Sequence, residues 1–141
     1  MKNLVFTIVL LLAAGFALGQ SLQKGNMIST HILTVELKPG VTLDQVVDYY
    51  NTRWIPDAEK YFDWKMFIAT GIRSSESIEN KLLLIVHFNT EADRDKYFKM
   101  AEDGTDLNEL GQKAWAQFSP TAQALDALAT VKNEWYDWAV K

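Results

Sequence analysis

Alternating hydrophobic and polar residues predict β-strands along the chain. The alternation is strict over 30–38, where Pro39 ends the strand, and it returns over 132–140. Two apolar, β-prone runs, 64–71 and 82–88, are separated by a polar, Ser-rich stretch, so we expect them to form a long hairpin. The chain therefore contains four predicted strands.

Apolar residues at helical spacing predict helices between these strands. Thr42, followed three residues later by Gln45, is a capping-box signature that opens the first helix. The apolar face of this helix carries Leu43, Val46, Val47, Tyr50 and Trp54. Pro56 lacks an amide donor and disfavours helical geometry in the residue before it, so we expect a kink or a second short helix over 57–61.

Three more helical segments are predicted before the last strand. Thr90 is the expected N-cap of a helix that runs through Tyr97 to Gly104. Thr105 is expected to cap a segment with apolar residues at helical spacing: Leu107, Leu110, Ala114, Trp115 and Phe118. Pro120, after a serine, is expected to open a separate Ala-rich helix that ends near residue 130.

The predicted order of elements is β-α-β-β-α-β, with an extra helical insertion before the last strand. This order is typical of a ferredoxin-like α+β domain, in which one antiparallel sheet carries its helices on one face. The other face would expose strand residues such as Phe67 and Ile85. We therefore expect a homodimer that forms through the sheets.

The first nineteen residues have the layout of a secretory signal peptide. Basic Lys2 precedes an apolar run over 4–18, and the small residues Ala17 and Gly19 fit a cleavage site that leaves Gln20 at the new N-terminus. A membrane anchor is the alternative, but the run is shorter than the roughly 20 residues that span a bilayer, and no charged stop-transfer cluster follows it. We expect a periplasmic or secreted protein that has no membrane association once the leader is removed.

The predicted organisation is a leader at 1–19, a linker at 20–29 and one domain at 30–141. Because Lys2 lies in the leader, 13 of the 14 Lys and Arg residues remain against 18 Asp and Glu, a net charge of −5. The positive residues are scattered, which argues against a nucleic-acid partner. The chain has no cysteine, so disulfides do not stabilise it. Its many aromatic residues suit a filled core or an apolar pocket.

The order of elements and two sequence stretches resemble the stress-responsive dimeric α/β-barrel family. The stretches are HILTVELK at 31–38 and FNTEADRDKY at 88–97. The wider superfamily includes polyketide cyclases, cofactor-free monooxygenases and haem-degrading enzymes. In the cyclases, a histidine that opens the first strand and a tyrosine line a pocket between sheet and helices, and His31 and Tyr97 match them by position. The histidine that those enzymes use as a general base has no counterpart in 98–104, where Asp103 is a weak base at neutral pH.

Six residues are candidates for binding a ligand: His31, Tyr50, Arg53, Trp54, Tyr97 and Trp115. The parity of its strand directs His31 toward the helices, where it serves either a pocket or a buried structural hydrogen bond. The guanidinium of Arg53 either reaches the pocket mouth or is solvated or paired with Asp57. Trp115 either covers the pocket or packs as an ordinary helix residue.

No motif for phosphate binding, covalent catalysis or paired-cysteine chemistry occurs in the sequence. His31 and His87 are predicted to lie on opposite faces of the sheet, and neither has a second ligand at zinc-like spacing, so we expect no metal. We also expect no cofactor, although a single axial histidine is enough for haem.

Three functions agree with these features. The first is an exported protein that binds a small molecule in an apolar, aromatic-lined pocket. The second is a cofactor-free, cyclase-like or monooxygenase-like enzyme that acts on a small aromatic or polyketide-like compound, with His31 as base or proton donor. The third is a structural or interaction module without a pocket. A cavity of about 300 Å³ or more lined by His31, Tyr50 and Tyr97 would favour the first two.

Overall fold

The computed structural model describes residues 22–71, 79–99 and 106–141. The elements in chain order are β1 (Met27–Leu37), α2 (Leu43–Tyr49), the π-helical segment η1 (Tyr50–Trp54), α3 (Ile55–Tyr61), β2 (Lys65–Thr70), β3 (Lys81–Phe88), α4 (Glu91–Asp95), α5 (Glu109–Ala124), the 3-10 turn η2 (Leu125–Ala127) and β4 (Ala129–Ala139). The predicted leader lies outside the described residues. Within the described ranges, no helix has the length and apolar character needed to cross a membrane.

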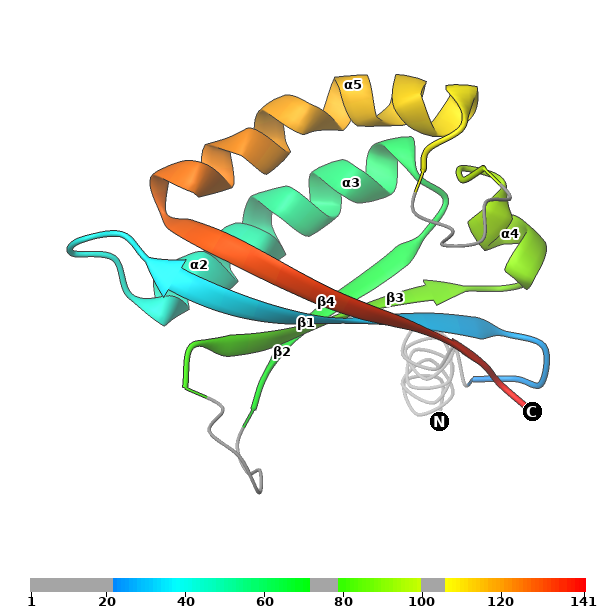
Figure 1. Cartoon of the computed structure of the whole chain (residues 1–141), viewed down its shortest axis with the longest axis horizontal. Helices are drawn as coiled ribbons and strands as arrows, with labels where there is room; N and C mark the ends of the chain where they lie inside the picture. Colours follow the sequence, from blue (N-terminus) through cyan, green and yellow to red (C-terminus); the bar gives the residue numbers. More distant parts are fainter. Residues whose placement is uncertain (1–21, 72–78, 100–105) are drawn as a thin grey trace, which may run out of the picture.

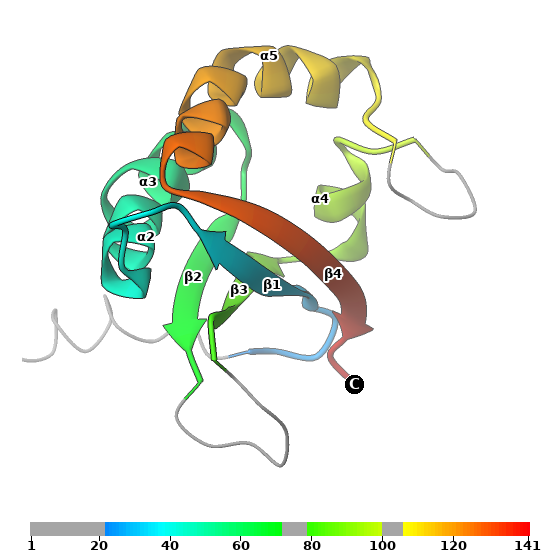
Figure 2. The ribbon, with the colours of Figure 1, turned by 60° about the vertical axis from the view of Figure 1, so that its left-hand side comes forward.

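The four strands form one antiparallel sheet in the order β2-β3-β1-β4. The hairpin of β2 and β3 is present, and β3 separates β1 from β2, as a split βαβ unit requires. The helices lie over one face of this sheet (Figures 1 and 2). The prediction of a ferredoxin-like α+β domain is therefore confirmed.

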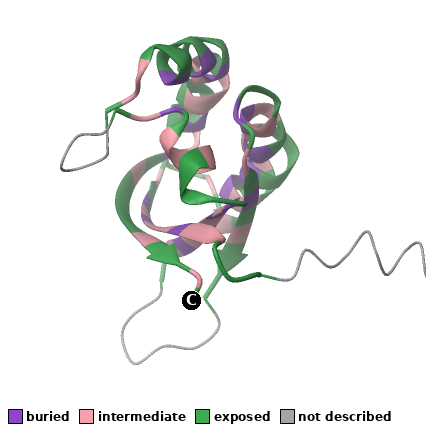
Figure 3. Ribbon diagram, turned by 90° about the vertical axis from the view of Figure 1, so that its right-hand side faces the viewer, coloured by how far each residue is buried: buried purple, intermediate pink, exposed green. Residues whose placement is uncertain are grey.

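The core lies between the sheet and the helices, where the buried residues gather (Figure 3). Strand parity decides which side chains enter it, because successive residues of a strand point to opposite faces. The alternating residues of β3 from Leu82 to Phe88 are buried, as are Leu33 and Val35 of β1. Phe118 of α5 packs down onto this layer and is almost fully buried.

The first helical region starts as predicted, and the second short helix expected near Pro56 is α3, which begins one residue before the proline. The N–H of Gln45 donates to Thr42 Oγ1 at 3.3 Å, and the N–H of Thr42 donates to Gln45 Oε1 at 2.8 Å, so the capping box is formed. The chain then widens into η1, in which the Ile55 N–H donates to the carbonyl of Tyr50 five residues earlier. Pro56 lies in the first turn of α3, where a missing N–H is tolerated, and α3 follows η1 without a gap.

The helix predicted from Thr90 to Gly104 is wrong in length, because α4 ends at Asp95. Thr90 is its N-cap as expected. The backbone beyond it is held by Asn108, whose N–H donates to the Tyr97 carbonyl at 3.0 Å and whose Nδ2 donates to the Lys96 carbonyl at 2.8 Å. These bonds replace the next helical turn. Residues 100–105, with the predicted cap Thr105, lie outside the described ranges.

The prediction of two separate helices on either side of Pro120 is also wrong. A single helix, α5, runs through this residue, and its N-cap is Asn108, whose Oδ1 accepts the Gly111 N–H at 3.0 Å. Pro120 has no N–H to offer the carbonyl of Ala116, four residues earlier. The hydroxyl of Ser119 donates to that carbonyl at 3.4 Å instead, which reduces the cost of the proline.

The first strand begins at Met27, so the end of the predicted linker, 27–29, belongs to the sheet. The last strand likewise begins earlier than predicted, at Ala129. Both extensions follow from one pairing, since β1 and β4 are in register along eleven residues from Met27 to Leu37. Because the two strands pair along their whole length, each continues beyond the part of its sequence in which hydrophobic and polar residues alternate.

Candidate ligand-binding site

Polar residues occupy part of the sheet face that points toward the helices. Ser29 and His31 precede Leu33 on the inward side of β1, and the register places Asp137 beside Ser29 and Trp135 beside His31. Since cross-strand neighbours share a face, these four side chains all point toward the helices. One end of the sheet therefore presents polar and aromatic groups where the other end presents aliphatic core.

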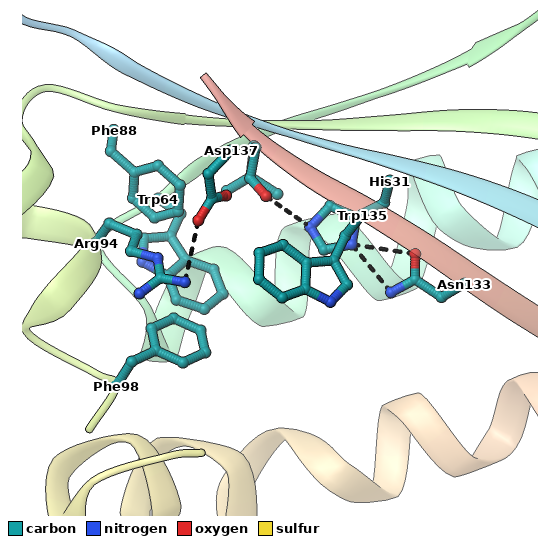
Figure 4. A pocket seen from close by; sticks show the side chains of 10 residues that line it. His31, Trp64, Phe88, Arg94, Phe98, Asn133, Trp135 and Asp137 are labelled. Atoms are coloured by element: carbon teal, nitrogen blue, oxygen red, sulfur yellow. Dashed lines mark hydrogen bonds and ion pairs between the residues drawn. The ribbon is translucent and has the colours of Figure 1, made fainter. Parts of the chain in front are cut away.

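These groups border a cavity of about 200 Å³ between the β1 and β4 strands and the segment that follows α4 (Figure 4). The residues that line it are Ser29, His31, Trp64, Val86, Phe88, Arg94, Phe98, Asn133, Trp135 and Asp137. Four of the ten lining residues are Trp or Phe, and the polar groups come from two adjacent strands and one helix.

His31 is held by hydrogen bonds at both ring nitrogens. Its Nε2 lies 3.2 Å from Ser29 Oγ, and its Nδ1 lies 3.2 Å from Oδ1 and 3.0 Å from Nδ2 of the Asn133 amide. Burial lowers the pKa of His31, and this effect outweighs the Asn133 hydrogen bond and the charge of Asp137, which both raise it. The ring is therefore neutral at pH 7 and has one nitrogen that accepts a proton.

Arg94 reaches the cavity from α4 with its charge already compensated. Its guanidinium lies 3.0 Å from a carboxylate oxygen of Asp137 and 3.2 Å from one of Asp95. The guanidinium carbon also lies 4.5 Å from the centre of the Phe98 ring, a cation–π contact. Because the Arg94 side chain is only 12% exposed, these contacts lie in a poorly solvated place and fix the side chain firmly.

Stacked aromatic rings build the wall opposite β4. Trp64 is parallel to Phe98, with ring centres 6.1 Å apart, and meets the ring of Phe88 edge to face at 5.6 Å. The buried indole nitrogen of Trp64 has no hydrogen-bond partner within the part of the chain that the structure describes. Trp135 of β4 closes the other side and remains 37% exposed. The cavity thus has aromatic rings on two sides.

Of the six residues predicted to bind a ligand, His31 lines the cavity. Tyr97 lies behind the wall, with its ring centre 5.4 Å from that of Trp64 and its phenol oxygen accepting the Asp63 N–H at 3.0 Å. Tyr50 and Trp54 lie in the core, where Trp54 contacts Phe118 edge to face. Burial raises the pKa of Tyr50 to about 12.

The other two predicted residues lie on the helix layer and away from the cavity. Arg53 is exposed and borders a separate surface depression together with Asp57 and Thr121. Trp115 is 45% exposed and packs edge to face on Phe118. The six predicted residues are therefore not brought together, and the cavity is smaller than the 300 Å³ that the sequence reasoning required.

Sequence reasoning did not select eight of the polar or aromatic residues that line the cavity: Ser29, Trp64, Phe88, Arg94, Phe98, Asn133, Trp135 and Asp137. A signal for three of them exists in the alternation of the last strand, which places Asn133, Trp135 and Asp137 on one side. The approach of Arg94 has no comparable signal, since it depends on where α4 packs.

Within the described ranges, His, Cys, Asp and Glu side chains do not gather in groups of three or more that suit a metal ion. His87 pairs with Ile28 and Lys65 across the sheet, on the face opposite to His31.

No known family model matches the chain, and no curated protein does. Similar solved structures include SnoaB, a cofactor-independent oxygenase from Streptomyces nogalater, with 14% identity and a TM-score of 0.42 over 83% of this chain and 95% of that chain. A dimeric ferredoxin-like protein of unknown function from Thermobifida fusca has 12% identity and a TM-score of 0.40 over 86% and 99%. A dimeric ferredoxin-like protein of unknown function from Bacteroides fragilis has 11% identity and a TM-score of 0.37 over 80% and 96%.

The chain thus has a loose structural likeness to these proteins, two of which are described as ferredoxin-like. Identities of 11 to 14% and TM-scores below 0.5 assign neither an activity nor an assembly to it.

Proposed function

We propose that this chain is an exported protein that binds a small, partly aromatic molecule in the cavity. The observation that carries the proposal is the convergence of the hydrogen-bonded set Ser29, His31 and Asn133 with the aromatic walls of Trp64 and Trp135 around one open space. Ligand sites are typically apolar hollows with a few placed polar groups. The same convergence supports binding over a module without a pocket.

A cofactor-free enzyme acting on such a molecule is the second candidate, and the state of His31 favours it. A neutral imidazole held in place by Ser29 and Asn133 keeps one ring nitrogen unprotonated, and such a nitrogen is suited to take a proton from a bound substrate. Binding and catalysis are separated by incubating the protein with each bound compound in air, without added cofactor. Turnover that is lost in His31→Gln, while binding persists, would favour the enzyme.

Truncating the cavity wall should weaken binding. We expect Trp135→Ala to lose at least about tenfold in affinity, or about 1.4 kcal/mol, for small aromatic compounds found by thermal shift and measured by calorimetry. Trp115→Ala is the matched control, since Trp115 is 45% exposed on the helix layer and lies away from the cavity. Equal losses in the two variants would contradict the proposed site. The proposed site would also be contradicted if no compound in a broad panel of aromatic molecules bound to the protein.

Export is proposed from the leader-like segment 1–19, and the protein would be periplasmic or secreted. Protein recovered from the exported fraction of its host should have an intact mass that corresponds to a chain starting at Gln20 or within a few residues. Full-length chain retained in the membrane fraction would instead support the membrane anchor.

A homodimer is proposed from the sheet face that carries no helices. Phe67, Tyr136 and Trp138 lie on this face and are 59%, 48% and 55% exposed. Charges of both signs surround them, including the pair of Glu36 and Lys132. An apolar centre with a mixed polar rim suits a second copy of the same face, because a twofold axis brings opposite charges within reach of each other.

A further inference from the structure

We infer that the ligand is an uncharged molecule of one or two fused rings with a hydroxyl or carbonyl oxygen directed at Ser29. This inference rests on the proposed binding function and names the class of ligand. Three properties of the cavity carry it: its volume, the balance of its charges and the hydrogen bonds of His31.

The volume limits the number of rings. Sites for drug-sized ligands commonly enclose about 300–1,000 Å³. The cavity holds about 200 Å³, and its flat aromatic walls, Trp64 and Trp135, favour a planar occupant. A fused bicyclic compound is thus near the upper limit, and extended polycyclic compounds would require the wall to move.

The charges disfavour an ionised ligand. Among the described residues, Arg94 and Asp137 are the charged side chains that line the cavity, and they pair with each other at 3.0 Å. Asp95 adds a second carboxylate 3.2 Å from the same guanidinium, and His31 is neutral. A carboxylate ligand would therefore meet no surplus positive charge, and an ammonium ligand would have to compete with Arg94 for carboxylates that already bind its guanidinium. Burying an unpaired charge costs far more than burying a neutral polar group.

The hydrogen bonds of His31 suit a neutral oxygen of either kind. If Nδ1–H donates to Asn133 Oδ1, then Nε2 accepts the Ser29 proton, and Ser29 Oγ is left to accept from a ligand hydroxyl. If Nδ1 accepts from Asn133 Nδ2, then Nε2–H donates to Ser29 Oγ, and the Ser29 hydroxyl is left to donate to a ligand carbonyl. A change of the His31 tautomer therefore switches Ser29 between accepting from a ligand hydroxyl and donating to a ligand carbonyl.

Four probes of matched size test the inference: naphthol, naphthoate, naphthylmethylammonium and naphthalene, titrated calorimetrically into the mature protein at neutral pH. We expect naphthol to bind at least tenfold more tightly than either ion. Ser29→Ala should weaken naphthol binding three- to tenfold and leave naphthalene binding unchanged, because only naphthol uses the hydroxyl. Thr52→Ala is the control, since it removes a hydroxyl that donates to the Asp48 carbonyl on the exposed helix surface.

The outcomes separate the ligand class from the binding function. If naphthoate or naphthylmethylammonium binds most tightly and loses affinity in Trp135→Ala, the ligand class is overturned while the binding site stands. If none of the four probes binds the wild-type protein, both are overturned. If Ser29→Ala does not fold, Asn133→Ala is the second variant. Asn133 is exposed and forms the other hydrogen bond of His31, so we again expect weaker binding of naphthol and unchanged binding of naphthalene.

Discussion

Gly111→Ala is expected to lower the free energy of unfolding by about 3 kcal/mol or more. A Cβ atom at this position would lie 2.2 Å from the Tyr97 carbonyl oxygen and 3.0 Å from Leu107 Cδ2. The Leu107 side chain is able to shift, but the Tyr97 carbonyl is backbone and accepts the Asn108 N–H at 3.0 Å. Relieving the clash therefore means moving the start of α5 away from the segment that carries Phe98 in the cavity wall.

Urea unfolding of the mature domain measures this effect, with Gly40→Ala as the control. A methyl group at Gly40 would have no described atom within 4 Å, but the φ of this residue is +79°, so alanine there costs only the roughly 1–2 kcal/mol of a left-handed backbone. If Gly111→Ala were no more costly than Gly40→Ala, the close approach of α5 to Tyr97 would be wrong. We also expect Gly111→Ala to weaken ligand binding, whereas Gly40→Ala should not.

Ile85→Asp is expected to raise the dissociation constant of the proposed homodimer at least about a hundredfold, or about 2.7 kcal/mol. Ile85 is at the middle of the face without helices, between Phe67 of β2 and Thr30 of β1. In a twofold dimer, an aspartate there would place two carboxylates within an apolar interface. The repulsion between the two carboxylates and the cost of their desolvation would oppose association.

Light scattering and sedimentation over a range of concentrations measure this change, with Asn51→Asp as the control because it adds the same charge on the exposed helix layer. The mature domain should have twice its monomer mass at micromolar concentration. Phe67→Asp, at a 59% exposed position of an edge strand, replaces Ile85→Asp if the latter does not fold. A monomeric wild-type domain, or equal weakening by the Asn51 control, would exclude a dimer through this face.

The face of each strand residue could be predicted from the sequence because parity is a local property of an extended chain. His31 points inward with Leu33, while Ile85 and Phe67 point outward, as predicted. The capping box of Thr42 and Gln45 was equally predictable, since both partners lie within one helical turn. These predictions need only residues close in the sequence.

The errors in the helices arose where distant or compensating contacts outweighed local signals. The apolar residues after Asp95 have helical spacing. Asn108, which lies beyond the predicted helix, instead donates hydrogen bonds to the backbone carbonyls of this segment. Pro120 is a strong signal for a new helix, yet the Ser119 hydroxyl supplies the missing donor and α5 continues. A single-residue propensity is worth too little energy to prevail over such bonds.

By itself, the sequence determined the α+β class, the order of the four strands along the chain, and the inward direction of His31. The tertiary structure decided which groups surround that histidine. Asn133 is 102 residues away and becomes its neighbour through the β1–β4 register, and Arg94 arrives because α4 packs over the same end of the sheet. The periodicity of a strand predicts the direction in which a side chain points. The neighbours of that side chain depend on pairing and packing between segments that are far apart in the sequence.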